Sequence, residues 1–268
     1  MTDWIKQLAN IPGIIVAENH LLATHLPMRV GGPVECWIRC LSLGGIKQAL
    51  PIIRRQTWRI HWPFEEWLVR DSGIHGCVLR LEGDFEQIRV YPDAIELGSA
   101  ALWSNIPIHA IHFAELAKWS GSVGASILHD NAEKLFSGME MEVEWLQGRH
   151  KHRIYYDQNT KFQAPNNAIP LYIKIFHIRK KKNIKPIRNG QLFQLEKKSL
   201  PSTYLQELSL DAVRLRNWKI SVDNPNYVVH TGMGELEDLQ LLQKALNQRL
   251  QPARNTSLEL RLSIFGKK

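Results

Sequence analysis

The sequence predicts an α+β protein, because segments with apolar residues at helical spacing are mixed with short segments in which every second residue is apolar. Of its 268 residues, 44% are hydrophobic and 22% are charged, which is typical of a globular protein with a sizeable core. No apolar run reaches the roughly 18 residues of a membrane helix, and the first residues lack the pattern of a secretory leader. We therefore expect a cytoplasmic protein without membrane insertion.

The elements expected before residue 160 are short. Helices are predicted where apolar residues recur every three or four positions, and strands where they alternate between turn signals. In chain order they are helix 1–13, strand 14–16, turn 30–33, strand 36–38, helix 45–53, a meander of strands 77–79, 87–90 and 94–97, helix 108–119, and a hairpin of strands 142–146 and 152–156.

The C-terminal part begins after an alternating strand over 171–178, where the basic run 179–188 marks a boundary. Helices are expected over 201–210 and 236–250. A last alternating strand over 258–264 is expected to return to an earlier sheet. The second helix has a stripe of leucines on one face, which indicates that this face is turned to the core. The leucines of the stripe are Leu239, Leu242, Leu246 and Leu250.

The chain has an excess of positive charge and few cysteines. Its formal net charge of +8 favours anionic partners such as nucleotides. The basic run 179–188 could bind phosphates, but a basic run beside a proline is more often a solvated linker, so nucleic acid is not the expected partner. Cys36, Cys40 and Cys77 form no CxxC pair and are expected to be buried, reduced thiols.

Four segments carry a resemblance to a known family. Residues 29–34 read R-V-G-G-P-V, 97–103 read L-G-S-A-A-L-W, 116–126 read L-A-K-W-S-G-S-V-G-A-S and 219–232 read K-I-S-V-D-N-P-N-Y-V-V-H-T-G. In order and spacing they resemble segments of the MurB-type UDP-N-acetylenolpyruvoylglucosamine reductases. The family segments are R-V-G-G-P-A, G-A-G-A-x-W, L-A-G-I-P-G-T-V-G-G-A and A-x-V-S-x-x-H-A-N-F-I-V-N-x-G.

The resemblance implies an FAD-binding fold of the vanillyl-alcohol-oxidase (PCMH) type with two subdomains, followed by a C-terminal α+β domain that binds substrate. We place the first subdomain at 1–56, the second at 57–180 with a returning strand at 257–268, and the C-terminal domain at 181–256. The family passes a hydride from NADPH through FAD to the enolpyruvyl group of a UDP-sugar, for peptidoglycan synthesis. Asn226 and Tyr227 match the family's substrate-binding stretch.

The first phosphate-binding loop departs from the family pattern. FAD's pyrophosphate must approach backbone N–H groups closely, so the family uses small residues in G-x-G-S-N-L-L-V-x-D. This chain reads W-P-F-E-E-W-L-V-R-D over 62–71. Glu65 and Glu66 would repel phosphate, since a like-charge contact near 4 Å costs roughly 4 kcal/mol at an effective dielectric of about 20. The aromatic residues here are interpreted as fillers of an emptied flavin cleft, and less readily as a surface for sugars or bases. They are Trp58, Trp62, Phe64 and Trp67.

The second loop and the N-terminal turn keep more of the pattern, and we interpret their residues as vestiges of the FAD site. A tight turn without a ligand is favoured over a phosphate site as the reason for the second loop's glycines. No FAD is therefore expected to bind. The vestigial residues are Arg29, Gly31, Gly32, Gly121, Ser122, Val123 and Gly124.

The groups that the family's chemistry requires are replaced as well. Reduction needs an acid that protonates the carbon beside the carboxylate, which the family supplies from the serine of G-S-x-F-K-N-P. Gln191 stands at that position, and Arg261 stands at the family's glutamate of L-E-P-E. An amide has no usable acidic proton, and a guanidinium stays protonated near neutral pH.

Three functions are open from the sequence. The first is a catalytically inactive paralogue without FAD, a pseudoenzyme that binds a UDP-sugar or a cell-wall synthesis protein in a regulatory role. The second is a divergent but active reductase that uses FAD and NADPH. The third is binding of nucleic acid or an anionic surface through 179–188. No metal is expected, because the histidine pairs lack carboxylate or cysteine company. These pairs are His109 with His112 and His150 with His152.

Overall fold

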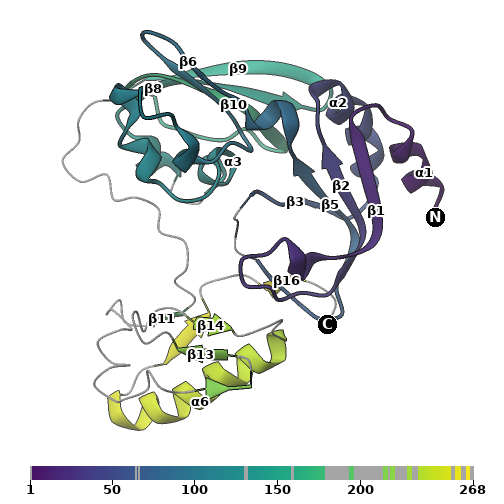
Figure 1. The fold of residues 1–268 in the computed structure, drawn as a ribbon, viewed down its shortest axis with the longest axis vertical. Coiled ribbons are helices and arrows are strands. Elements are labelled where there is room, and N and C mark those ends of the chain that lie inside the picture. Colours follow the sequence, from purple (N-terminus) through teal and green to yellow (C-terminus); the bar gives the residue numbers. More distant parts are fainter. Residues whose placement is uncertain are drawn as a thin grey trace. The chain divides into compact units, whose positions relative to one another are not determined.

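Two compact units divide the chain, and Figure 1 shows their helices and strands. Unit 1 comprises Met1–Glu18, Cys36–Glu65 and Gly76–Arg188, and unit 2 comprises Asn19–Glu35, Glu66–His75 and Asn189–Lys268. The subdomain boundaries expected from the sequence stay a prediction. The computed structural model describes residues 2–63, 65, 67–129, 132–157, 160–178, 193–195, 214–216, 218–220, 228–230, 235–254, 257–260 and 264–265.

The first sheet has the strand order β1-β2-β5-β3. Its strands are β1 (Ile14–Leu21), β2 (Pro33–Cys40), β3 (Trp58–Ile60) and β5 (Ile74–Leu81). Helices α1 (Asp3–Ala9) and α2 (Leu43–Ile53) share one apolar core with β2 and β5. The α2 helix begins after Ser42, whose side chain accepts a hydrogen bond from the Gly45 N–H at 3.1 Å, as an N-cap does.

All three cysteines lie in this core. Cys36, Cys40 and Cys77 are buried and form no disulfide, so the prediction of buried thiols is confirmed. Burial raises the pKa of the Cys40 thiol to about 12, which keeps it in the neutral form.

The second sheet of unit 1 is antiparallel throughout, with the order β6-β7-β10-β8-β9. One face packs on an aromatic core that includes Trp103, Trp119 and Phe136, and this core is covered by short helices (Figure 1). The strands are β6 (Ile88–Val90), β7 (Ile95–Gly98), β8 (Met139–Gln147), β9 (His150–Tyr156) and β10 (Ala168–Ile178), and the covering helices include η3 (Trp103–Asn105), α3 (Val123–Ile127) and α4 (Ala132–Phe136).

The meander expected over 77–97 is wrong. The strand β5 belongs to the first sheet, whereas β6 and β7 form a hairpin in the second. The 3₁₀ helix η2 (Gly83–Glu86) lies between them and redirects the chain from one sheet to the other. Gly83 enters this turn with a φ of 61°, a conformation that favours glycine.

The helix expected over 108–119 is also wrong. Two short 3₁₀ helices, η4 (Ile111–Phe113) and η5 (Leu116–Lys118), occupy this segment instead. Its buried residues recur at every third position, which matches the 3.0 residues per turn of a 3₁₀ helix. Ile108 is 97% exposed, so apolar character alone misassigned it to a buried face. The buried residues are Ala110, Phe113, Leu116 and Trp119.

Unit 2 gathers its apolar core around α6 (Leu236–Arg254), which packs with Val30, Leu68 and Trp218. The predicted leucine stripe of α6 is confirmed, since all four leucines are fully buried. The strand expected over 258–264 is observed in two pieces. They are β15 (Leu258–Leu260), antiparallel to β11 (Phe193–Leu195), and β16 (Ile264–Phe265), parallel to β4 (Leu68–Val69).

The remaining strands of unit 2 form a small antiparallel sheet, β12-β13-β14. Their bounds are Arg214–Leu215, Trp218–Ile220 and Val228–His230, and a 3₁₀ helix, η1, spans Leu22–Thr24. The expected helix 201–210 and the basic run 179–188 lie outside the described residues. Of the helices that the structure describes, none combines the length and the apolar character of a membrane-spanning segment.

The open face of the second sheet carries a buried carboxylate. Glu144 on β8 is 8% exposed and accepts hydrogen bonds from Lys151 Nζ at 2.9 Å and Arg153 Nε at 3.0 Å. Burial by itself raises the pKa of Glu144, but these hydrogen bonds and charges outweigh it, so the pKa lies below its ordinary value.

We expect Glu144→Gln to lower the free energy of unfolding by about 1–2 kcal/mol near pH 7. A carboxylate with a depressed folded pKa stabilises the protein above its unfolded pKa of about 4.3, and this contribution is lost as the pH falls through the folded pKa. The gap between wild type and variant in urea unfolding should therefore shrink below about pH 4. Glu115→Gln removes an exposed ion pair with Lys118 and serves as the control. An equal gap at neutral and acidic pH would contradict this account.

Candidate functional site

The N-terminal turn of the expected FAD site packs backbone against backbone within unit 2. The N–H groups of Gly32 and Gly73 both donate to the Arg70 carbonyl, at 3.0 and 2.9 Å. A Cβ on Gly32 would lie 2.0 Å from the Asp71 carbonyl oxygen, and Gly31 has a φ of 141°, so both positions favour glycine. The close approach of the two segments accounts for these glycines without a ligand.

Arg29 is exposed and adopts a φ of 49° at the start of this turn. Its backbone N–H donates to the Leu26 carbonyl at 2.9 Å. The left-handed conformation of Arg29 therefore belongs to the turn itself, and its role toward FAD stays a prediction.

The second expected phosphate loop, in unit 1, leads into α3. Gly121 has a φ of 82°, and Ser122 is the N-cap residue, whose Oγ accepts the Ala125 N–H at 3.3 Å. The Ser122 side chain is fully buried. It therefore satisfies a donor of its own helix.

The next two donors of this loop are also engaged. The Val123 N–H donates to the Ala101 carbonyl at 2.9 Å, and the Gly124 N–H donates to the Ser99 carbonyl at 2.6 Å. These are the backbone groups that the sequence assigned to phosphate. In this structure their hydrogen bonds tie α3 to the end of β7.

The indole of Trp62 lies directly against Gly124. Trp62 is 2% exposed, and a Cβ on Gly124 would approach three atoms of its six-membered ring at 2.4, 2.6 and 2.7 Å. Such distances leave no room for another group between them. The ring thus covers the backbone at the loop where a phosphate was expected.

The residues after Trp62 close a turn on themselves. The Trp62 N–H donates to Glu65 Oε2 at 2.9 Å, and the Glu65 N–H donates to the Trp62 carbonyl at 3.0 Å. The Glu65 carboxylate therefore already accepts the hydrogen bond from the Trp62 N–H, which is no longer available to a phosphate oxygen. Trp58 is half-buried in the same core as Trp62, and Trp67 is buried within unit 2, whereas Phe64 and Glu66 lie outside the described residues.

A dinucleotide pyrophosphate does not fit this part of unit 1. The ring of Trp62 occupies the space over Gly124, the N–H groups of Val123 and Gly124 are paired, and Glu65 adds a negative charge. Binding would expose the Trp62 ring to water and break the hydrogen bonds of the Val123 and Gly124 N–H groups. It would also bring a negatively charged phosphate next to the Glu65 carboxylate.

The predicted catalytic and substrate positions are not among the described residues. They are Gln191, Arg261, Asn226 and Tyr227. In the part of the chain that is described, no three His, Cys, Asp or Glu side chains gather closely enough to hold a metal ion.

The sequence did not reveal two backbone hydrogen-bond acceptors at the second loop, nor the hydrogen bond that the Glu65 side chain accepts. The Ser99 and Ala101 carbonyls accept the donors of the second loop, and backbone acceptors have no signature in the sequence. Glu65 was assigned only a repulsive effect on phosphate, whereas its side chain also accepts the Trp62 N–H. A capping-type spacing of three residues between donor and carboxylate is the signal that could have suggested this bond.

The chain is similar in sequence to known bacterial proteins. No family model matches it. It is 20% identical over 291 residues to the UDP-N-acetylenolpyruvoylglucosamine reductase of Anoxybacillus flavithermus, with 94% of this chain and 95% of that protein covered. It is also 20% identical over 285 residues to the same-named reductase of Bacillus subtilis, covering 91% and 93%. Both relatives are UDP-N-acetylenolpyruvoylglucosamine reductases, and the likeness extends over more than nine-tenths of this chain.

The chain also has the expected fold. It is similar to the crystal structure of MurB from Thermus caldophilus, with a TM-score of 0.65 and 17% identity over 94% of this chain and 99% of that one. The predicted fold class is thereby confirmed.

The contact between Trp62 and Gly124 can be measured with a double-mutant cycle. We expect Gly124→Ala to destabilise the protein by about 1–3 kcal/mol, because the new methyl group meets the ring and overpacking outweighs the better helix propensity of alanine. In the Trp62→Ala background the same change should be neutral or stabilising, because the obstructing ring is gone. Thermal or urea unfolding of the four proteins gives the coupling. Additive effects of the two substitutions would show that the ring does not pack on Gly124.

Proposed function

We propose that this MurB-family chain does not hold FAD and acts as a binding or regulatory protein, not as a reductase, in the synthesis of peptidoglycan precursors. The observation that carries the proposal is the Trp62 indole against Gly124, at the end of a turn closed by Glu65. A group of the size and charge of pyrophosphate would have to displace both.

The family's chemistry supports the same proposal. Gln191 and Arg261 stand where the resemblance places an acidic serine and a glutamate. General acid and base groups each contribute about 10²- to 10⁴-fold to a rate. Replacing two such groups would leave little turnover even with a flavin present.

The relatives suggest the pathway and the ligand class. The proteins of Anoxybacillus flavithermus and Bacillus subtilis are named as reductases of a UDP-linked sugar. We therefore propose a UDP-sugar or a cell-wall synthesis protein as the partner, and the cytoplasm as the place of action.

The flavin content of the purified protein tests the proposal. We expect no visible flavin absorption, and no rise in melting temperature with added FAD. A ligand at about 100 times its Kd would stabilise the native state by about 2.7 kcal/mol, which is a shift of several degrees for a chain of this size. The Bacillus subtilis reductase, handled identically, is the positive control. Stoichiometric flavin in the isolated protein would overturn the proposal.

Growth of a reductase-deficient bacterium tests the missing activity separately. We expect this chain not to restore growth, because the acid positions are replaced, whereas the Bacillus subtilis reductase should restore it at equal expression. Rescue by this chain would show that it is an active reductase with a rebuilt site.

A further inference from the structure

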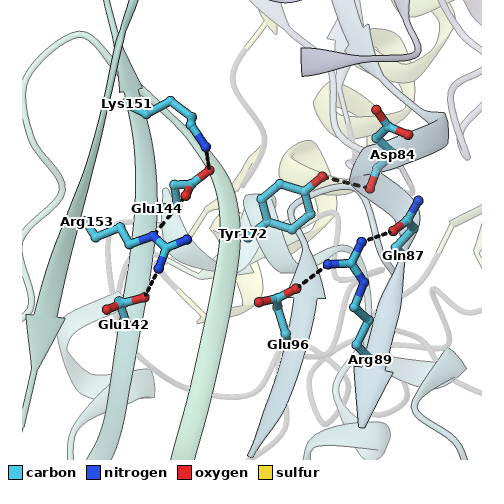
Figure 2. Close-up of polar contacts among 9 residues, drawn as sticks. All are labelled: Asp84, Gln87, Arg89, Glu96, Glu142, Glu144, Lys151, Arg153 and Tyr172. Atoms are coloured by element: carbon cyan, nitrogen blue, oxygen red, sulfur yellow. Dashed lines mark hydrogen bonds and ion pairs between the residues drawn. The ribbon is translucent and has the colours of Figure 1, made fainter. Parts of the chain in front are cut away.

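A groove lies on the open face of the second sheet, away from the loop of Trp62. Figure 2 shows it between two rows of charged side chains, with Tyr172 of β10 on its floor. The hollow has a volume of about 400 Å³, within the roughly 300–1,000 Å³ of small-molecule sites. All of its lining residues belong to unit 1.

One wall comes from β8 and β9. Arg153 donates from Nε to Glu144 at 3.0 Å and contacts the Glu142 carboxylate at 3.3 Å, while Lys151 holds the other oxygen of Glu144 at 2.9 Å. These bonds orient the guanidinium toward the two carboxylates, while 63% of the Arg153 side chain stays exposed to solvent.

The opposite wall comes from the β6–β7 hairpin. Arg89 contacts Glu96 at 3.0 Å and donates to the Gln87 side chain at 2.6 Å (Figure 2). On the floor, the Tyr172 hydroxyl donates to the Asp84 carbonyl at 3.1 Å, which fixes the ring. Two ion-paired guanidinium groups therefore lie on either side of one hydrogen-bonded aromatic ring.

The charges of the groove cancel. Its lining includes four carboxylates and four cationic side chains, so the groove has no net attraction for a phosphate or for a cation. Each carboxylate can accept about four hydrogen bonds and each guanidinium can donate five, more than the paired groups use here. Closely spaced spare donors and acceptors match vicinal hydroxyl groups, because a hydroxyl donates and accepts at once.

We propose that this groove binds a neutral saccharide, with the Arg89–Glu96 and Arg153–Glu142 pairs bonding its hydroxyl groups over Tyr172. An ion-pair ladder that only stabilised the sheet would not require a hollow between its two rows. The inference does not rest on the absence of FAD or of reductase activity, so either proposal can fail without the other.

Titration of the ¹⁵N-labelled full chain with glucose, glucosamine and glucose 6-phosphate tests the ligand class, because the three share one ring and differ in charge. We expect saturable shifts of the β10 amides with glucose or the neutral disaccharide cellobiose, at millimolar Kd, and at least about tenfold weaker binding of the two charged sugars. No saturable shift with either neutral sugar up to about 100 mM, or tighter binding of the phosphate, would overturn the proposal.

A charge-balanced variant tests the location. Arg89→Gln with Glu96→Gln removes one wall and leaves the net charge unchanged, so it should weaken neutral-sugar binding at least about tenfold. Glu115→Gln with Lys118→Gln removes an exposed ion pair outside the groove and should bind as the wild type does. Melting curves of both variants establish that they are folded. Unchanged binding by the first variant, or equal loss in both, would refute a saccharide site in this groove.

Discussion

The packing of the Trp62 ring on Gly124 is the contact on which the candidate site depends. A glycine at that position fits two structures equally well, one in which backbone faces a phosphate and one in which it faces an aromatic ring. The close approach of the ring shows that the second holds here. The family's glycine is thus present, and its lack of a side chain serves a protein contact.

The hydrogen bonds around this contact are self-contained. Helix α3 begins with its donors satisfied by Ser122 and by the backbone leaving β7, and the Trp62 turn is satisfied by Glu65. Buried backbone groups carry a large penalty when unpaired. A loop whose polar groups are already paired gains little hydrogen-bond energy from binding an anion. The local hydrogen bonds therefore support the proposal that this chain does not hold FAD.

The second sheet shows how one alternating pattern yields two surfaces. Along β8, Met141, Val143 and Trp145 enter the aromatic core, while Glu142 and Glu144 point to the opposite face. Cross-strand partners on β9 then neutralise these carboxylates, as Arg89 of β6 does for Glu96 of β7. The groove lies between these two sets of ion pairs, on the face of the sheet opposite the aromatic core.

The sequence predicted most of this fold where a period was long and clear. The leucine stripe of α6, the helix predicted over 45–53 and the strand predicted over 171–178 all follow from spacing, and they correspond to α6, α2 and β10. The segment 108–119 did not, because apolar residues such as Ile108 and Ile111 are exposed and the buried ones follow a period of three. The bulky ring of Trp62 and the carboxylate of Glu65 could be predicted from their residue types. The carbonyls of Ser99 and Ala101 could not, because any residue has a carbonyl and only the tertiary structure brings these two to the second loop.

The short parallel pairing of β16 with β4 has a kinetic consequence. Ile264 and Leu68 are partners although they lie roughly 200 residues apart in the chain. Closing so long a loop costs configurational entropy before any contact compensates for it, and proteins dominated by distant pairings fold slowly. Unit 2 joins Glu66–His75 to the distant stretch Asn189–Lys268. We therefore expect it to be the later of the two units to form when the protein refolds.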